Sequence, residues 1–167
     1  AGHICLPSYE RRFQPGIRDE DIMPATLSYN LITRLLREQL GFNGLVVTDA
    51  SHMGGMTAAA PRSRQVPGAI AAGCDMFLFF NDVEEDFSYM MEGYRNGMIT
   101  EERLNDAVTR ILGLKAHLGL HIKQKEGMLV PKKDLSCVGC EKHRRMEDEA
   151  AAKSITLVKD TLHQLPI

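Results

Sequence analysis

Apolar residues recur at helical spacing between Ser28 and Gly41. Ser28 is well placed to cap the start of a helix, and Gly41 is well placed to end it. The apolar positions between them are Leu31, Ile32, Leu35, Leu36 and Leu40. Because this spacing puts them on one face, the sequence predicts an amphipathic helix that packs against a core.

Two further helices are predicted downstream. The first ends at Asn96-Gly97, and its apolar positions are Phe87, Met90, Met91 and Tyr94. The second follows Thr100, which can cap it, carries Glu101 and Glu102 at its positive end, and stops at Gly119. Its expected buried stripe is Leu104, Val108, Ile111, Leu114 and Leu118.

Apolar runs at about 2–6, 45–48 and 75–80 are predicted to be strands that alternate with these helices. The run Leu45-Val46-Val47 has no polar alternation, which is typical of a parallel strand buried on both faces. Strands that alternate with helices indicate parallel βαβ units. The predicted fold class is therefore α/β, with parallel strands.

Asp49 follows the middle run at its carboxyl end. The carboxyl ends of parallel strands are where α/β folds gather their catalytic groups, so Asp49 is a candidate catalytic residue. Asp after a strand also commonly caps the following helix or turn. From the residues alone, both interpretations stay open.

The segment around Asp49 closely resembles glycoside hydrolase family 3, in the part of its barrel that carries the catalytic nucleophile. In that family a Pro-Ala-Thr-Leu-Ser helix leads into Gly-Phe-(Asp/Asn)-Gly, an apolar strand, Ser/Thr-Asp and a nearby Met-Gly. The matching residues are Pro24-Ala25-Thr26-Leu27-Ser28, Gly41-Phe42-Asn43-Gly44, Thr48-Asp49 and Met53-Gly54. The resemblance continues over 68–80, 99–112 and 152–159.

The resemblance implies the C-terminal portion of a (β/α)8 TIM-type barrel. Residues 1–120 then hold its last three strand–helix units, 121–150 form a linker, and 151–167 begin an α/β sandwich domain. A whole barrel needs roughly 250 residues, and this chain has 167. We therefore expect an internal fragment of a larger enzyme.

The resemblance also implies a reaction and a set of site residues. Retaining glycosidases use two carboxyl groups, one as nucleophile and one as acid/base, and Asp49 resembles the nucleophile. His3, His52 and Met53 are expected to line the sugar site. Each also has a structural interpretation: His3 as a hydrogen-bonded structural histidine, His52 as a solvated loop residue and Met53 as ordinary packing.

The expected activity is hydrolysis of terminal β-N-acetylglucosaminides through a covalent intermediate on Asp49. The alternatives are a β-glucosidase of the same family and a non-catalytic fragment that binds sugar or associates with itself. The family's acid/base is an Asp–His pair in an upstream Lys-His-Phe-x-Gly-His-Gly-Asp loop, or a Glu in the sandwich domain. This sequence lacks that loop, so we expect the isolated chain to be inactive.

Charge and composition limit the classes of partner that this chain is expected to bind. The 20 basic and 22 acidic residues are interspersed, so nothing favours nucleic acid. No apolar stretch approaches the roughly 18 residues of a membrane span. The expected partner is a carbohydrate substrate, and no cofactor is expected. The open strand edges are expected to be covered either by a second copy of the chain, in a homo-oligomer, or by the missing part of the same barrel.

The cysteines give weaker evidence on metal binding and on the cellular compartment. Cys5 and Cys74 lie in apolar runs and are expected to be small core residues. Cys137 and Cys140 with His143 could supply three zinc ligands, but a fourth is not apparent, so no metal is expected. A disulfide or redox pair is the other alternative to reduced surface thiols. Reduced thiols favour a cytoplasmic setting; secretion stays open because the true amino terminus is expected upstream.

Overall fold

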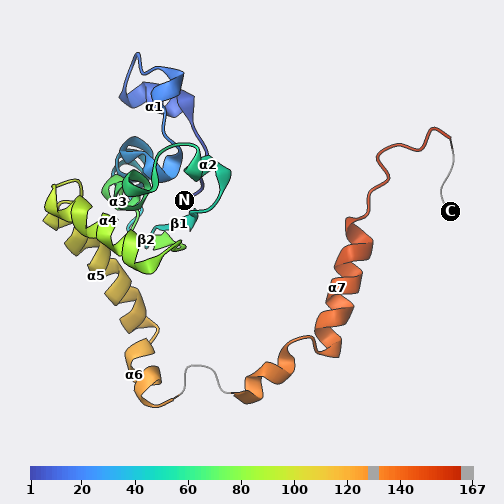
Figure 1. Ribbon diagram of the computed structural model, residues 1–167. Coiled ribbons are helices and arrows are strands. Elements are labelled where there is room, and N and C mark those ends of the chain that lie inside the picture. Colours follow the sequence, from blue (N-terminus) through green and yellow to red (C-terminus); the bar gives the residue numbers. More distant parts are fainter. Residues whose placement is uncertain (128–131, 163–167) are drawn as a thin grey trace. The chain divides into compact units, whose positions relative to one another are not determined.

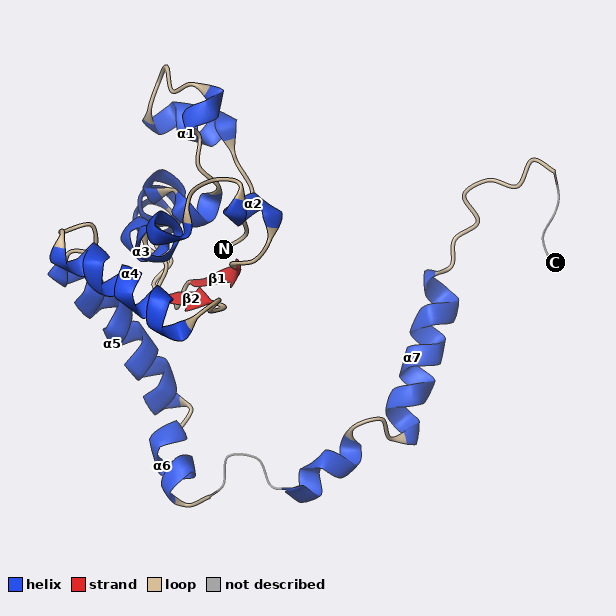
Figure 2. Cartoon of the chain, viewed as in Figure 1, coloured by secondary structure: helices blue, strands red, loops and turns tan. Residues whose placement is uncertain are grey.

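The computed structural model describes residues 1–127 and 132–162 and divides into two compact units, Ala1–Gly119 and Leu120–Ile167. The first unit contains a small parallel sheet of β1 (Val47–Ala50) and β2 (Met76–Leu78). The chain crosses between these strands through α2 (Gly54–Thr57) and α3 (Arg62–Ala72) (Figures 1 and 2). The predicted βαβ unit is therefore confirmed, with shorter strands than expected.

The strand predicted at about 2–6 is wrong. Only Ala1 pairs with β1, where its carbonyl accepts the Asp49 N–H at 2.8 Å. The carbonyl of Ile4 instead accepts the Ala25 N–H at 2.9 Å, and the chain then enters α1 (Pro7–Phe13). Cys5 consequently lies exposed rather than in the core.

The helix predicted between Ser28 and Gly41 is present as a π-helix, η3 (Asn30–Gln39), after the short 3₁₀ turns η1 (Asp19–Asp21) and η2 (Ala25–Leu27). The Ser28 hydroxyl accepts the Leu31 N–H at 3.1 Å, which confirms the predicted cap. Gly41 follows the helix with a φ of +69°, a conformation that favours glycine.

The next two helices are α4 (Val83–Arg95) and α5 (Glu101–His117), and Thr100 caps α5 by accepting the Arg103 N–H. The expected buried stripe of α5 is only partly correct. Among its members Leu104 and Ile111 are half-buried, whereas Val108, Leu114 and Leu118 are exposed. The C-terminal part of α5 extends away from the other helices of this unit (Figure 1), which accounts for the exposure of the stripe at that end.

The core of the first unit lies between η3 and the sheet, where Ile32, Val46 and Cys74 pack together with Leu36 against them. Cys74 is fully buried, as predicted, and burial raises the pKa of its thiol to about 11. This apolar packing holds β1 and β2 against η3. The carboxyl ends of the two strands, and the turns that follow them, lie outside this packed cluster.

The second unit contains α6 (Leu120–Lys125), η4 (Lys132–Cys137) and α7 (Glu141–Ser154). No residue of α7 is buried. Residues 155–160 have no regular structure, so the sandwich-domain assignment of 151–167 stays a prediction, and 163–167 lie outside the described residues. Across the described ranges, no helix is long and apolar enough to cross a membrane.

Candidate active site

Asp49 is the third residue of β1, and its side chain is exposed. One carboxylate oxygen, Oδ1, accepts the N–H of Ala50 at 2.7 Å. Within residues 1–127 and 132–162 the carboxylate makes no other hydrogen bond, so Oδ2 is open. The following helix, α2, begins after Met53 without a side-chain cap. The capping interpretation of Asp49 is therefore wrong for this helix.

The register of β1 against β2 is irregular at Thr48 and Asp49, as in a β-bulge. Val47 pairs with Met76 and Ala50 pairs with Leu78, so β1 has one more residue than β2 between these pairs. Buried Thr48 fills the gap, because its Oγ1 accepts the Leu78 N–H at 2.8 Å. Bulges of this kind bend a strand and redirect a side chain, and they are frequent beside active sites.

His3 lies beside this strand end and is half-buried. Its Nδ1 is 2.9 Å from Thr26 Oγ1, and its Nε2 is 3.0 Å from the carbonyl oxygen of Ala50. A carbonyl can only accept, so Nε2 carries a proton. A Cβ at Gly55 of α2 would lie 2.6 Å from the carbonyl oxygen of His3, so α2 packs tightly on this segment.

His52 and Met53 lie in the turn that follows β1, and both are exposed, Met53 by 47%. The N–H of Met53 donates to the carbonyl of Ala50 at 3.1 Å. The structure thus brings His52 and Met53 to the end of β1 with Asp49, and His3 reaches the same place through Ala50. Their contacts with sugar stay predictions.

Three residues at this end were not found from the sequence: Ser51, Arg62 and Asp86. Ser51 is fully buried and accepts a hydrogen bond from Arg62 Nη1 at 2.7 Å. Arg62 Nε donates to Asp86 Oδ1 at 2.8 Å. The hydrogen bonds from Arg62 lower the pKa of Asp86, and burial only partly opposes them. Neither charged residue carries a local signal, because each lies in the polar first turn of a helix.

A second buried carboxylate lies at the opposite ends of the strands. Asp75 Oδ2 accepts Arg37 Nη2 at 2.7 Å and the Val46 N–H at 2.8 Å, and Oδ1 pairs with Arg103. Asp75 therefore has a paired structural role at the amino ends of the strands. Burial raises the pKa of Asp106, but a hydrogen bond from Arg110 and the charge of Arg103 outweigh it and lower that pKa.

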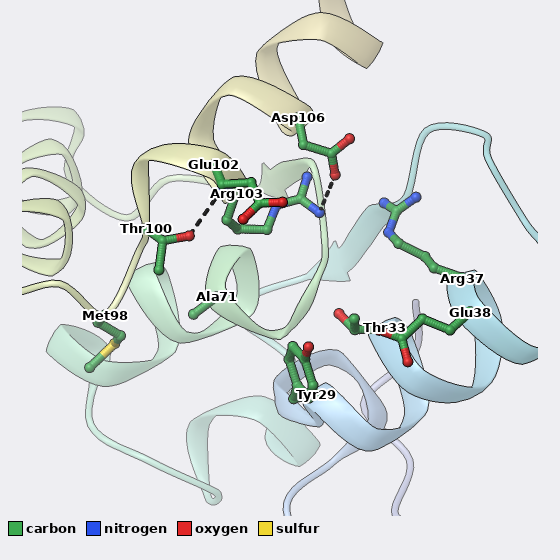
Figure 3. Close-up of a pocket in the computed structure, with 10 residues that line it drawn as sticks. All are labelled: Tyr29, Thr33, Arg37, Glu38, Ala71, Met98, Thr100, Glu102, Arg103 and Asp106. Atoms are coloured by element: carbon green, nitrogen blue, oxygen red, sulfur yellow. Dashed lines mark hydrogen bonds and ion pairs between the residues drawn. The ribbon is translucent and has the colours of Figure 1, made fainter.

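A hollow of about 640 Å³ is lined by Arg37 and Arg103, two partners of this second carboxylate, and Figure 3 shows the side chains around it. Its walls come from η3 and α5, and Ala71 of α3 lies on its floor. Its arginines, Arg37 and Arg103, are already paired with Asp75. Because Asp49 is not among its lining residues, this hollow is separate from the candidate site.

The cysteine pair lies in the second unit, where Cys140 occupies the position before α7 and its carbonyl accepts the His143 N–H at 2.9 Å. Across the described part of the chain, no group of three or more His, Cys, Asp or Glu side chains could hold a metal ion.

The chain matches the family model described as "Glycosyl hydrolase family 3 N terminal domain" over residues 1–114. It is 51% identical to a "Beta-N-acetylglucosaminidase/beta-glucosidase" of Cellulomonas fimi, over 99% of this chain and 29% of that protein. It is 30% identical to "Beta-hexosaminidase A" of Pseudoalteromonas piscicida, over 95% of this chain and 27% of that protein.

Among solved structures, the chain resembles "Beta-glucoside phosphorylase BglX bound to 2FGlc". The TM-score is 0.84 at 40% sequence identity, and the match covers 99% of this chain and 29% of that one. The chain thus spans less than a third of the length of each of these proteins.

Proposed function

This chain belongs to glycosyl hydrolase family 3, and from that premise we propose that the full-length protein is a retaining β-glycosidase whose nucleophile is Asp49. In the relatives the family's N-terminal domain is a TIM-barrel-type fold, and the parallel β1–β2 pair with its helices is consistent with part of such a barrel. One observation carries the proposal: Asp49 presents an open carboxylate oxygen at the carboxyl end of a parallel strand.

The proposed chemistry has two steps. Oδ2 of Asp49 attacks the anomeric carbon while an acid protonates the departing oxygen, which leaves the sugar covalently bound to Asp49. An acceptor then attacks the same carbon, and the bond to Asp49 breaks. The hydrogen bond from the Ala50 N–H to Oδ1 holds the carboxylate while Oδ2 reacts.

The proposed substrates are terminal β-N-acetylglucosaminides, with His52 and Met53 forming part of the sugar-binding wall. The sequence Thr48-Asp49-Ala50 followed by Met53 supports this branch, as do the hexosaminidase names of several relatives. β-Glucosides are the alternative substrate, since the name of the Cellulomonas fimi relative includes both activities. His3 serves this site by holding the carbonyl of Ala50.

The acid/base is proposed to lie outside this chain. The Lys-His-Phe-x-Gly-His-Gly-Asp loop of the N-acetylglucosaminidase branch does not occur in the sequence. Loss of one partner of a catalytic pair typically lowers the rate by orders of magnitude. The chain alone is therefore expected to turn over no glycoside at a useful rate.

Water is not the only acceptor that the second step allows. The similarity to a beta-glucoside phosphorylase, at 40% identity over 99% of this chain, favours inorganic phosphate as a second candidate acceptor. A phosphate oxygen would then form the new bond to the anomeric carbon as the bond to Asp49 breaks. The product would be a sugar phosphate rather than a free sugar.

The chain is also proposed to need a cover for its strand edges, either the rest of its own barrel or a second copy. Phe79 and Phe80 follow β2 and are exposed, and Ile4 is exposed on the segment beside β1. Apolar residues beside unpaired strand edges promote association. Light scattering that finds the isolated chain as a clean monomer would contradict this part.

The test of the reaction uses full-length protein with aryl β-N-acetylglucosaminide and aryl β-glucoside, each with and without inorganic phosphate. Proton NMR follows the first product formed. A β-configured product confirms retention, the faster substrate identifies the branch, and a sugar phosphate identifies phosphate as the acceptor. An α-configured first product, or no turnover of either glycoside, would overturn the proposed function.

A further inference from the structure

Arg62 links four segments at the end of the sheet where Asp49 lies. It is the first residue of α3, and its side chain is only 14% exposed. Its guanidinium lies 5.0 Å from the ring centroid of Phe77 in β2. It also contacts the turn after β1, the residue after β2 and the first turn of α4.

One side of the guanidinium is fixed by Asp86. Nε and Nη2 of Arg62 donate to the two carboxylate oxygens of Asp86 at 2.8 and 2.5 Å. Asp86 is 1% exposed and also accepts the Asn81 N–H at 3.1 Å. This two-pronged pairing fixes the plane of the guanidinium, which a lysine ammonium could not do.

The other side of the guanidinium holds the two strand ends together. Nη1 donates to Ser51 Oγ at 2.7 Å, and Nη2 donates to the carbonyl of Phe79 at 3.0 Å. Ser51 Oγ itself donates to the same carbonyl at 2.6 Å, and the Ser51 N–H donates to the carbonyl of Leu78 at 2.7 Å. Beyond the bulge, Ser51 is thus bonded to the end of β2 on both its backbone and its side chain.

Ser51 is two residues from Asp49, and only Ala50 separates them. We propose that Arg62 is a positioning residue for Asp49: Asp86 orients the guanidinium, the guanidinium fixes Ser51 against Phe79, and this fixes the direction of the Asp49 carboxylate. The inference rests on the proposed function, in which Asp49 is the nucleophile.

The energetics of buried ion pairs agree with a geometric role. A buried pair adds little net stability compared with apolar packing of the same volume, because both charges lose their hydration. Its fixed hydrogen-bond geometry is what apolar side chains cannot replace. A displacement of a reacting group by about 1 Å can lower a rate by about 100-fold. Weaker hydrogen bonding among Arg62, Asp86 and Ser51 should therefore affect the chemical step more than sugar binding.

The test compares Arg62→Lys with Arg37→Lys in the full-length protein. Both changes replace the arginine partner of a buried aspartate by a lysine, but only Arg62 contacts Ser51. The probe is a fluoro-glycosyl fluoride of the preferred sugar series, whose fluoride leaves without needing a strong acid. Mass spectrometry gives the rate of covalent labelling and its half-saturating concentration, corrected for the folded fraction of each variant.

The expected result is a labelling rate about 10- to 100-fold lower in Arg62→Lys, with the half-saturating concentration nearly unchanged and with Arg37→Lys labelled like the unaltered protein. Ser51→Ala, a smaller change, should slow labelling in the same direction.

Labelling of Arg62→Lys at the unaltered rate, or an equal slowing in Arg37→Lys, would overturn the positioning role alone. Failure of the unaltered protein to become labelled would remove the proposed function and the inference with it.

Discussion

Two buried ion-pair clusters lie at opposite ends of the same two strands, and they use similar chemistry for different purposes. The lower cluster consists of Arg37, Asp75 and Arg103, and the upper cluster consists of Ser51, Arg62 and Asp86. In each, a carboxylate that is almost fully buried pairs with arginine. The clusters differ in what they hold in place.

The lower cluster holds the starts of the strands. Asp75 accepts the N–H of Val46 just before β1, and Arg37 also donates to the carbonyls of Gly73 and Gly44. These hydrogen bonds run from the Asp75 and Arg37 side chains to backbone groups that lie before the two strands. The upper cluster instead ends two residues from Asp49. In barrel enzymes the carboxyl ends of strands carry chemistry and the amino ends carry stability, and the two clusters fit that division.

The largest expected effect is at Asp49. Asp49→Asn should remove covalent labelling and lower turnover of the full-length protein by about 10⁴-fold or more, because the amide cannot act as the nucleophile. The thermal midpoint should hardly change, since the side chain is exposed and, among the described residues, accepts a hydrogen bond from its neighbour's N–H alone. Steady-state kinetics and thermal unfolding measure the two quantities. If Asp49→Asn kept most of its turnover, the carboxyl ends of the strands would not carry the nucleophile.

Asp75→Ala should show the reverse pattern. It removes the buried carboxylate that Arg37 and Arg103 share, although Arg103 keeps Asp106 as a partner. We expect the free energy of unfolding to fall by about 3 kcal/mol. Urea unfolding measures the loss. The labelling rate per folded molecule should match that of the unaltered protein. A strong fall in that rate would show that the lower cluster also serves the chemistry.

Gly55→Ala sharpens the comparison within the upper end. Its Cβ would lie 2.6 Å from the carbonyl oxygen of His3, so overpacking should cost about 1–3 kcal/mol of unfolding free energy. Gly54→Ala is the matched control, because nothing lies within 4 Å of the added Cβ there. Equal unfolding midpoints for the two variants would show that the contact between His3 and α2 adjusts to the added Cβ at little cost.

The smallest effect concerns pH. Hydrogen bonds from Arg62 hold the pKa of Asp86 below its ordinary value of 3.8. Ionised Asp86 therefore stabilises the folded state above that ordinary value, and the stabilisation is lost as the pH falls through the lower folded-state pKa. Urea unfolding over this acid range should show a weaker pH dependence in Asp86→Asn than in the unaltered protein. An identical dependence would contradict the pairing.

The sequence predicted features whose causes are local. Ser28 and Thr100 were found as caps because a cap needs only its own helix. The end of β1 was found because an apolar run and Asp49 adjoin in the chain. Features that depend on distant partners were missed or wrong. No strand forms at about 2–6, where the carbonyl of Ile4 accepts the N–H of Ala25 instead of pairing with β1. Val108 was expected to be buried and is exposed.

The upper cluster illustrates why part of the site could not be predicted. Arg62 and Asp86 are 24 residues apart and meet only because α3 and α4 pack together. In the sequence both resemble the solvated first turn of a helix, and no spacing rule connects them. Ser51 was equally hidden, because a serine after a strand is usually a turn residue.

The most direct test of the account is to map the residue that carries the sugar. Full-length protein treated with 2-fluoro-glucosyl fluoride, or with the 5-fluoro analogue of the 2-acetamido sugar, is digested, and the labelled peptide is sequenced by mass spectrometry. The account predicts a single ester-linked sugar on Asp49, in the peptide that contains Thr48 and Ser51. A label on another carboxylate, with Asp49 unmodified, would contradict it.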